Sequence, residues 1–165
     1  MKPKIIIVDN DDKIIGYKER GTLDRKDIYR VSALWVTNSK GQILLARRHR
    51  NKLHHPNMWG PSVAGTVDEG ETYEENIVKE AKEELGVVDV KFNKGPKRLV
   101  TGDYLHFTQW YTVILDWDLD KFTIQKDEVE EIKWFDKDEL LKGLKEKPEE
   151  FLPNMKVYVK VFNFV

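Results

Sequence analysis

The stretch Gly65–Val87, GTVDEGETYEENIVKEAKEELGV, decides the fold, because it combines a glycine-rich turn with a helical pattern of apolar residues. The apolar residues recur at the spacing of one helix face, which predicts a buried stripe on a helix from about Thr72 to Leu85. The stripe consists of Ile77, Val78, Ala81 and Leu85. Gly86 suits the left-handed conformation that commonly ends a helix. The sequence therefore predicts a turn followed by a core-facing helix.

Three glutamates, Glu80, Glu83 and Glu84, form an acid ridge along the border of the predicted stripe. Glu80 and Glu84 repel each other as an i,i+4 pair by roughly 0.2–0.5 kcal/mol, and the last turn of a helix favours cations. Lys79 can pair with Glu83 or with Glu75, one turn away on either side, which relieves only part of the repulsion. A hard divalent cation with oxygen ligands would relieve the rest, whereas the alternative is a solvated acidic helix face.

The spacing of the fixed residues carries more information than the acid ridge alone. Gly65 is followed after five residues by Glu71, and after seven more by Lys79-Glu80-Ala81, one residue, Glu83-Glu84, one residue and Gly86-Val87. This pattern resembles the Nudix box, Gly-x5-Glu-x7-Arg-Glu-apolar-x-Glu-Glu-x-Gly-apolar. The departure is Lys79, which keeps the positive charge of the family's arginine but loses its planar, bidentate fork.

The resemblance implies a Mg²⁺- or Mn²⁺-dependent pyrophosphohydrolase that acts on a nucleoside diphosphate linked to another group, or on a related organic diphosphate. It implies Glu80 and Glu84 as the main metal ligands and the Gly65 carbonyl as a further one. Glu83 is implied as a ligand or general base, so that Glu83 and Glu84 are the candidate catalytic residues. Glu71 is implied to support the loop and helix by pairing with Lys79. Divalent ions held by carboxylates suit this chemistry, because they neutralise diphosphate charge and activate water.

Composition favours one globular domain, since the 165 residues are 40% hydrophobic and 35% charged. The net charge of −1 offers no basic field for a nucleic acid polymer. The absence of cysteine excludes disulfides and a cysteine nucleophile and is compatible with a cytoplasmic enzyme. No signal peptide or membrane-spanning segment is expected. A small-molecule diphosphate is the expected partner, and a homodimer is compatible with these observations.

The coarse pattern of the chain predicts an α+β fold with a mixed β-sheet. The resemblance covers about residues 28–144 and implies an α/β/α sandwich. The expected domain, residues 1–165, divides into an N-terminal hairpin and connector (1–27), a Nudix core (28–144) and a C-terminal helix (145–165). The expected strands are Lys4–Val8, Lys13–Lys18, Ile28–Thr37, Gln42–Arg48, Val87–Val100, Tyr104–Asp116 and Glu130–Phe135. The further expected helices are Lys137–Leu144, capped by Asp136, and Pro153–Phe162.

A basic cluster after one expected strand is a candidate for binding phosphates. Arg47 and Arg48 are the preferred residues, because alternation along the strand sends at least one of them toward the sheet face beside the box. The alternative is a solvated loop. His54 and His55 follow, but adjacent residues on an extended chain point in opposite directions, which disfavours a shared metal ion.

The segment leading into the box, Pro56–Gly65, resembles that of Nudix hydrolases in the branch similar to isopentenyl-diphosphate isomerase, and makes Trp59 a candidate substrate-binding residue. In the isomerase a catalytic cysteine precedes the box glycine and a metal-binding histidine follows it. Ala64 and Thr66 occupy these positions here, and no histidine occurs before His49. The isomerase is therefore the weaker alternative.

The acidic segment before a Trp-Phe strand end offers two more candidates, Glu128 and Glu131, as a metal ligand or base. The alternative is a charged turn into a strand. Three aromatic residues could stack on a base or pack in the core, namely Tyr104, Phe107 and Trp110. A non-catalytic Nudix-fold nucleotide-binding module is the remaining alternative, and the intact acid ridge argues against it.

Overall fold

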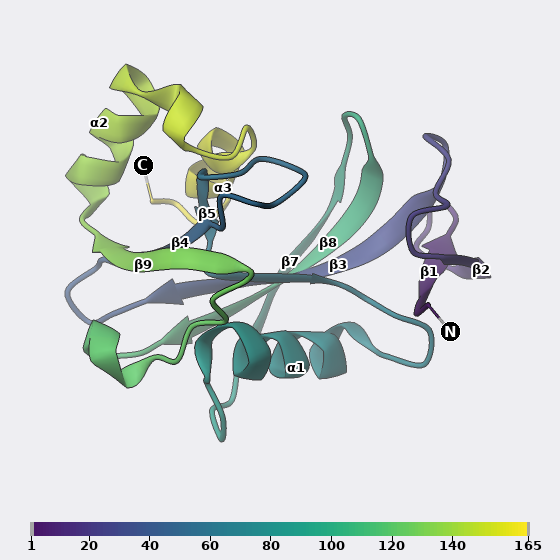
Figure 1. Cartoon of the computed structure of the whole chain (residues 1–165), viewed down its shortest axis with the longest axis horizontal. Coiled ribbons are helices and arrows are strands. Elements are labelled where there is room, and N and C mark those ends of the chain that lie inside the picture. The colour runs from purple at the N-terminus through teal and green to yellow at the C-terminus, as the bar shows by residue number, and fades with distance from the viewer. Residues whose placement is uncertain (1, 165) are drawn as a thin grey trace.

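The computed structural model describes residues 2–164. Within these residues nine strands form one mixed sheet, and helices pack against both of its faces (Figure 1). The strands are β1 (Lys4–Val8), β2 (Ile14–Glu19), β3 (Ile28–Thr37), β4 (Ile43–Arg48), β5 (Trp59–Pro61), β6 (Val63–Thr66), β7 (Asn93–Val100), β8 (Leu105–Ile114) and β9 (Val129–Phe135). The helices are α1 (Tyr73–Leu85), α2 (Lys137–Glu146) and α3 (Met155–Val161), with short 3-10 turns η1 (Leu119–Lys121) and η2 (Pro148–Glu150).

Strand β3 is the centre of the sheet. It runs parallel to β8 over its whole length, from the pair Ile28–Leu105 to the pair Thr37–Ile114. On its other edge it pairs antiparallel with β1 at its start, with β6 in its middle and with β4 at its end. The sheet continues from β8 to β7 and from β4 to β5 and β9. The predicted mixed sheet is confirmed.

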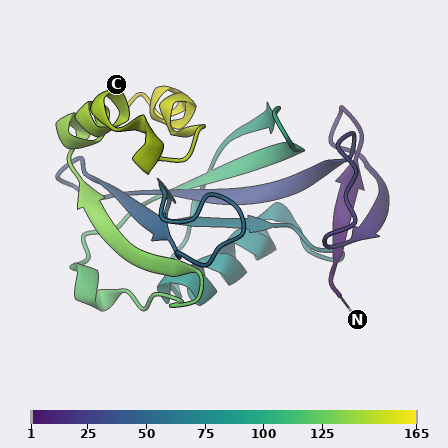
Figure 2. The ribbon, with the colours of Figure 1, turned by 45° about the horizontal axis from the view of Figure 1, so that its top comes forward.

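Alternation along β3 divides the core between two layers. Ala33 and Trp35 face a cluster that includes residues of α2 and α3, whereas Leu34 and Val36 face a cluster that includes the buried face of α1. Figure 1 shows α1 below the sheet and α2 with α3 above it, while the β1–β2 hairpin lies at the opposite end from α2. Figure 2 shows the same separation from a second direction. The predicted α/β/α sandwich is therefore confirmed.

Helix α1 begins and ends where local chemistry requires. Thr72 and Glu75 form a reciprocal capping box at its start, and Gly86 adopts the left-handed conformation at its end, with φ 67°. The buried residues are Asn76, Ile77, Ala81 and Leu85. The prediction for Val78 was wrong, because this side chain is 52% exposed. The buried face of α1 is rotated toward Asn76, which is buried in place of Val78.

The expected elements agree with the structure except in three places. Residues 87–92 are not a strand, so β7 begins only at Asn93. The short strands β5 and β6 replace the expected lead-in loop, because pairing with β4 and β3 outweighs the weak strand propensity of their glycines. Asp136 precedes α2 but makes no side-chain cap; instead its carboxylate accepts a hydrogen bond from Gln42 at 3.0 Å. Among residues 2–164, no helix has the length and apolarity needed to cross a bilayer.

Candidate active site

Gly65 and Glu80 lie in direct contact at the junction of β6 and α1. A Cβ atom built on Gly65 would collide with Cγ and Cδ of Glu80 and would lie 2.8 Å from its Oε1. The missing side chain of the glycine therefore provides the space in which the Glu80 carboxyl group lies. Burial raises the pKa of Glu80, Lys79 opposes this shift and Glu83 adds to it.

Glu84 occupies the most unfavourable position for a carboxylate in this region. Burial, followed by repulsion from Glu80 and Glu128, raises its pKa to about 8. A hydrogen bond from the Ala64 backbone N–H and the charge of Lys52 counteract only part of this effect. Glu84 is therefore a half-buried acid whose pKa is raised further by two neighbouring acids.

The remaining acids differ in how close they are to this pair. Glu83 is exposed on the same helix. Glu128 acts electrostatically on Glu84 and forms an ion pair with Lys52. The Glu131 carboxylate instead lies 3.4 Å from the Arg47 guanidinium, and the Glu131 side chain is 51% exposed. The structure thus brings Glu128, rather than Glu131, to the acid ridge.

Lys79 pairs with Glu71, as the box resemblance implies. It also lies 3.8 Å from a carboxylate oxygen of Asp68 and 3.8 Å from one of Glu80. The expected pairs of Lys79 with Glu83 and with Glu75 do not occur in the described part of the chain, since the Glu75 carboxylate is engaged in the capping box. Lys79 therefore faces the loop before the helix rather than the helix surface.

The chemistry of these donors fits a hard divalent cation. In residues 2–164, no group of three or more histidine, aspartate or glutamate side chains converges in a geometry that would already hold a metal ion. Even so, Glu80 and Glu84 present the oxygens of two half-buried carboxyl groups, one in the space left by Gly65 and the other beside Ala64. Oxygen ligands of this kind suit Mg²⁺ or Mn²⁺, whose charge would offset the repulsion.

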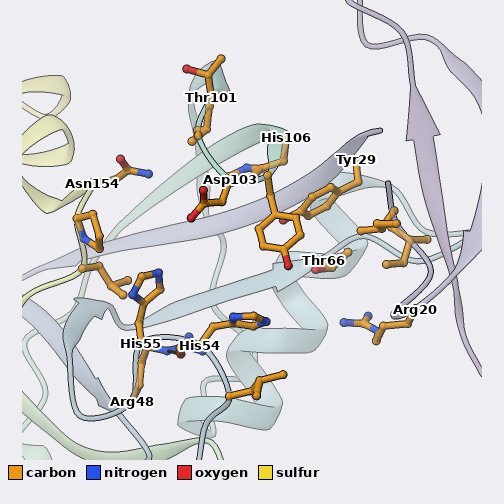
Figure 3. Close-up of a pocket in the computed structure, with 18 of the residues that line it drawn as sticks. Arg20, Tyr29, Arg48, His54, His55, Thr66, Thr101, Asp103, His106 and Asn154 are labelled. Atoms are coloured by element: carbon orange, nitrogen blue, oxygen red, sulfur yellow. Dashed lines mark hydrogen bonds between the residues drawn. The ribbon is translucent and has the colours of Figure 1, made fainter. Parts of the chain in front are cut away.

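A groove of about 970 Å³ is lined by Thr66, the residue after Gly65, but not by Glu80 or Glu84 themselves (Figure 3). Two of its basic side chains are Arg20, which follows β2, and Arg48, at the end of β4. Arg20 donates to Asp68 at 2.9 Å, and its charge acts on Glu80, which brings this end of the groove close to the acid ridge. Thr66, the last residue of β6, lies between the two arginines on the groove wall.

The rest of the groove carries aromatic and imidazole rings. Tyr29 and His106, from the parallel strands β3 and β8, have ring centroids 5.2 Å apart. His54 meets Tyr104 edge-on, with centroids 6.0 Å apart. Burial lowers the pKa of His106 to about 4, so this ring is neutral at physiological pH. The groove thus carries two separate arginines and an aromatic wall, and Arg20 ties one part of it to Asp68 of the box loop.

Several residues chosen from the sequence occupy other places. The Arg47 guanidinium lies 5.9 Å from the ring centroid of Trp59, and Trp59 is only 8% exposed within the core beneath α2 and α3. Trp110 is also a core residue. His54 and His55 both line the groove, because the chain bends there and His55 has a positive φ of 51°.

The sequence interpretation missed Arg20, Tyr29 and His106 as groove residues. No local motif marks them, since each belongs to a strand or strand end outside the box. The parallel pairing of β3 with β8, which places Tyr29 opposite His106, could have identified these two residues but not Arg20.

Comparison with known proteins agrees with this geometry. The NUDIX domain family matches residues 27–155. An uncharacterized Nudix hydrolase of Listeria monocytogenes is 30% identical over 116 residues, covering 69% of this chain and 67% of that protein. An isopentenyl-diphosphate Delta-isomerase of Klebsiella pneumoniae is 32% identical over 85 residues, covering 50% of this chain but only 46% of the isomerase.

Solved structures support the fold. A Deinococcus radiodurans protein superposes with a TM-score of 0.82 at 24% identity, covering 95% of this chain and 97% of that one. The MutT protein of Methanosarcina mazei superposes with a TM-score of 0.69 at 18% identity, covering 86% and 96% of the two chains. Together with the box at Gly65–Val87 and the match over most of the chain, these findings show that the protein belongs to the Nudix family of pyrophosphohydrolases.

Proposed function

We propose that the protein uses a divalent metal ion, Mg²⁺ or Mn²⁺, to hydrolyse the diphosphate linkage of a nucleoside diphosphate derivative. The observation that carries the proposal is the half-buried pair of acids, Glu80 and Glu84, held against Gly65 and Ala64. The neighbouring residue Thr66 lines a groove that carries two arginines. A folded protein tolerates such a pair when a cation binds it.

In this proposal the chain supplies ligands, orientation and charge. Glu80, Glu84 and the Gly65 carbonyl would hold the metal, with Glu83 as a further ligand or general base. Exposed Glu83 is accessible to water, and Glu128 beside Glu84 is the second candidate base. When bound, the metal would neutralise charge on the diphosphate oxygens and lower the pKa of a coordinated water.

The groove supports a substrate with a phosphate end and a planar end. Arg20 and Arg48 can bind phosphate oxygens, and the guanidinium fork suits bidentate contacts. Tyr29, His106 and Tyr104 offer ring faces and edges against which a base can pack. In a nucleoside diphosphate derivative the phosphates would contact the arginines and the base would contact the rings. An aliphatic diphosphate has no planar group to pack against the rings.

Two alternatives are less well supported. Isomerisation of an isopentenyl diphosphate lacks its expected side chains, because Ala64 and Thr66 flank Gly65. The similarity to the isomerase also covers less than half of that protein. A silent nucleotide-binding module does not account for the half-buried Glu84, whose pKa is raised by two neighbouring acids.

A substrate panel tests the proposal. Purified protein with Mg²⁺ or Mn²⁺ is incubated with nucleoside diphosphate derivatives, aliphatic diphosphates and isopentenyl diphosphate, and products are separated by chromatography. The proposal expects hydrolysis of at least one nucleoside diphosphate derivative in preference to every aliphatic diphosphate. Preferential hydrolysis of an aliphatic diphosphate overturns the substrate assignment, formation of the dimethylallyl isomer supports the isomerase, and no turnover with either metal overturns the enzymatic proposal.

A further inference from the structure

Asn76 is the residue of α1 whose burial the proposed function does not explain. It is fully buried on a helix face that is otherwise made of apolar side chains. Burying an amide is unfavourable unless its donors and its acceptor are paired. The hydrogen-bond partners of Asn76 therefore indicate what its side chain does.

The acceptor oxygen and both N–H donors of the Asn76 side-chain amide have hydrogen-bond partners. Its Oδ1 accepts a hydrogen bond from the Ser32 hydroxyl on β3. Its Nδ2 donates to the Thr66 carbonyl at 3.1 Å and to Glu71 Oε2 at 2.9 Å. Ser32 is itself the β3 partner of Gly65 in the ladder with β6. The amide thus joins the helix to the two strands at the position of the box glycine.

Glu71 is held at both of its carboxylate oxygens. Lys79 donates to Oε1, while Asn76 Nδ2 and the Asp68 backbone N–H, the latter at 3.1 Å, donate to Oε2. Burial alone would raise the pKa of Glu71, but the bonds from Lys79 and Asn76 hold it below its ordinary value. Two side chains of one helix therefore fix the orientation of this carboxylate.

Lys79 and Asn76 each bond to a different oxygen of Glu71, and this arrangement follows from having a lysine at position 79. An arginine presents a planar fork that can bind both oxygens of a carboxylate, whereas a lysine presents a single ammonium group. Lys79 bonds to one oxygen of Glu71 and is 3.8 Å from the nearest oxygens of Asp68 and Glu80. The second oxygen of Glu71 is left for other donors, and Asn76 is the side chain that bonds to it beside the Asp68 backbone N–H.

We propose that Asn76 is a positioning residue for the metal site, and that it makes the hydrogen bond that the lysine at position 79 cannot make. By tying Glu71 to the Thr66 carbonyl, Asn76 keeps Gly65 and the Glu80 carboxylate packed against it in place. The inference rests on the proposed function, because it assigns Asn76 a role toward the ion that Glu80 and Glu84 would hold. Asn76 itself touches neither metal nor substrate.

The test is Mn²⁺ binding to substrate-free protein, measured by calorimetric titration. Asn76→Ala should weaken Mn²⁺ binding by about tenfold, the lower end of the range for residues that orient metal ligands. Ile77→Val is the matched control, because Ile77 is equally buried on the same helix and makes no bond to Glu71. It should lower the thermal unfolding midpoint while leaving Mn²⁺ affinity unchanged within about twofold.

A rescue experiment separates this role from simple packing. Lys79→Arg should restore Mn²⁺ affinity in the Asn76→Ala background to within about threefold of the original protein, because the fork supplies the missing donor. Failure of this rescue overturns the division of bonds between Asn76 and Lys79. Unchanged Mn²⁺ affinity in Asn76→Ala, or an equal loss in Ile77→Val, overturns the positioning role itself.

Two further measurements keep the result interpretable. If Asn76→Ala does not fold, Ser32→Ala removes the bond that orients the Asn76 amide and should weaken Mn²⁺ binding in the same direction, whereas unchanged affinity opposes the inference. If the original protein binds no Mn²⁺ at all, the proposed function fails. If it binds Mn²⁺ and Asn76→Ala binds equally well, the inference about Asn76 fails alone.

Discussion

The side chain of Glu84 is half-buried near Glu80 and Glu128, so a negative charge there is poorly solvated and repelled by its neighbours. Its favourable contacts, the Ala64 N–H and the charge of Lys52, are too few to compensate. Residues of this kind are common at functional sites, where burial and like charge serve a bound ion or a proton transfer. At the residue scale, the metal hypothesis explains why this acid is where it is.

His106 leads to a prediction at the same scale. Its ring is half-buried against Tyr29, its Nδ1 lies 3.0 Å from the Thr108 hydroxyl oxygen, and desolvation lowers its pKa to about 4. The unfolded chain takes up a proton on this histidine near pH 6.5, whereas the folded protein does so only near pH 4. Its contribution to stability is therefore complete above pH 6.5 and is lost as the pH falls through the window from 6.5 to 4.

Replacing His106 by phenylalanine removes this titration and keeps a ring against Tyr29. The free energy of unfolding of the original protein should fall by about 2 kcal/mol more than that of His106→Phe between pH 6.5 and pH 4.5. Urea unfolding at these two pH values measures the difference. Tyr29→Phe is the control and should keep the original pH dependence, and an equally steep dependence in His106→Phe would contradict the assignment.

At the scale of elements, the β1–β2 hairpin is held to the rest of the fold by Asp12 in its turn. This side chain is buried and accepts hydrogen bonds from Arg30 on β3 and Lys97 on β7, both at 2.7 Å, and from the Tyr73 hydroxyl at 3.0 Å. Burial alone would raise the pKa of Asp12, but the bonds from Lys97 and Arg30 hold it below its ordinary value. The hairpin matters for the site because Arg20 follows directly after β2.

Asp12→Asn should therefore destabilise the protein by about 2 kcal/mol, because half-buried Arg30 and exposed Lys97 lose the counter-charge of a buried carboxylate. Asparagine tolerates the left-handed backbone found there, with φ 62°, so the effect reports the lost charge rather than strain. Urea unfolding measures it, with exposed Asp11→Asn as the control. A loss below about 0.5 kcal/mol in Asp12→Asn would refute the role of this cluster.

The elements also show what local sequence can predict. Helix α1 was predictable because Thr72, Glu75 and Gly86 specify its ends independently of the rest of the fold. The orientation of its buried face was not, because Asn76 is buried through bonds to Ser32 and Thr66, which only the folded sheet brings near. Strands β5 and β6 were missed for the same reason, since they are short and exist through their partners.

At the scale of the whole molecule, the groove is assembled by topology. Arg20, Arg48 and Thr66 come from the ends of three different strands, and the aromatic wall comes from the parallel pair β3 and β8. The acids of the box are adjacent in sequence and were predictable as a group. The arginine opposite them was not, because nothing near Arg20 in the sequence marks it, and Arg47 and Trp59, which looked suitable locally, pack against each other.

The measurement that tests the central claim most directly is the Mg²⁺ dependence of hydrolysis by the original protein and by Glu84→Gln. The best nucleoside diphosphate derivative from the panel serves as substrate, and Glu74→Gln, an exposed change of the same charge on the same helix, serves as control. We predict no hydrolysis after removal of divalent ions, full activity in Glu74→Gln, and a loss of about 100-fold or more in Glu84→Gln. Hydrolysis that persists without divalent ions, or that is unchanged in Glu84→Gln, would contradict the account.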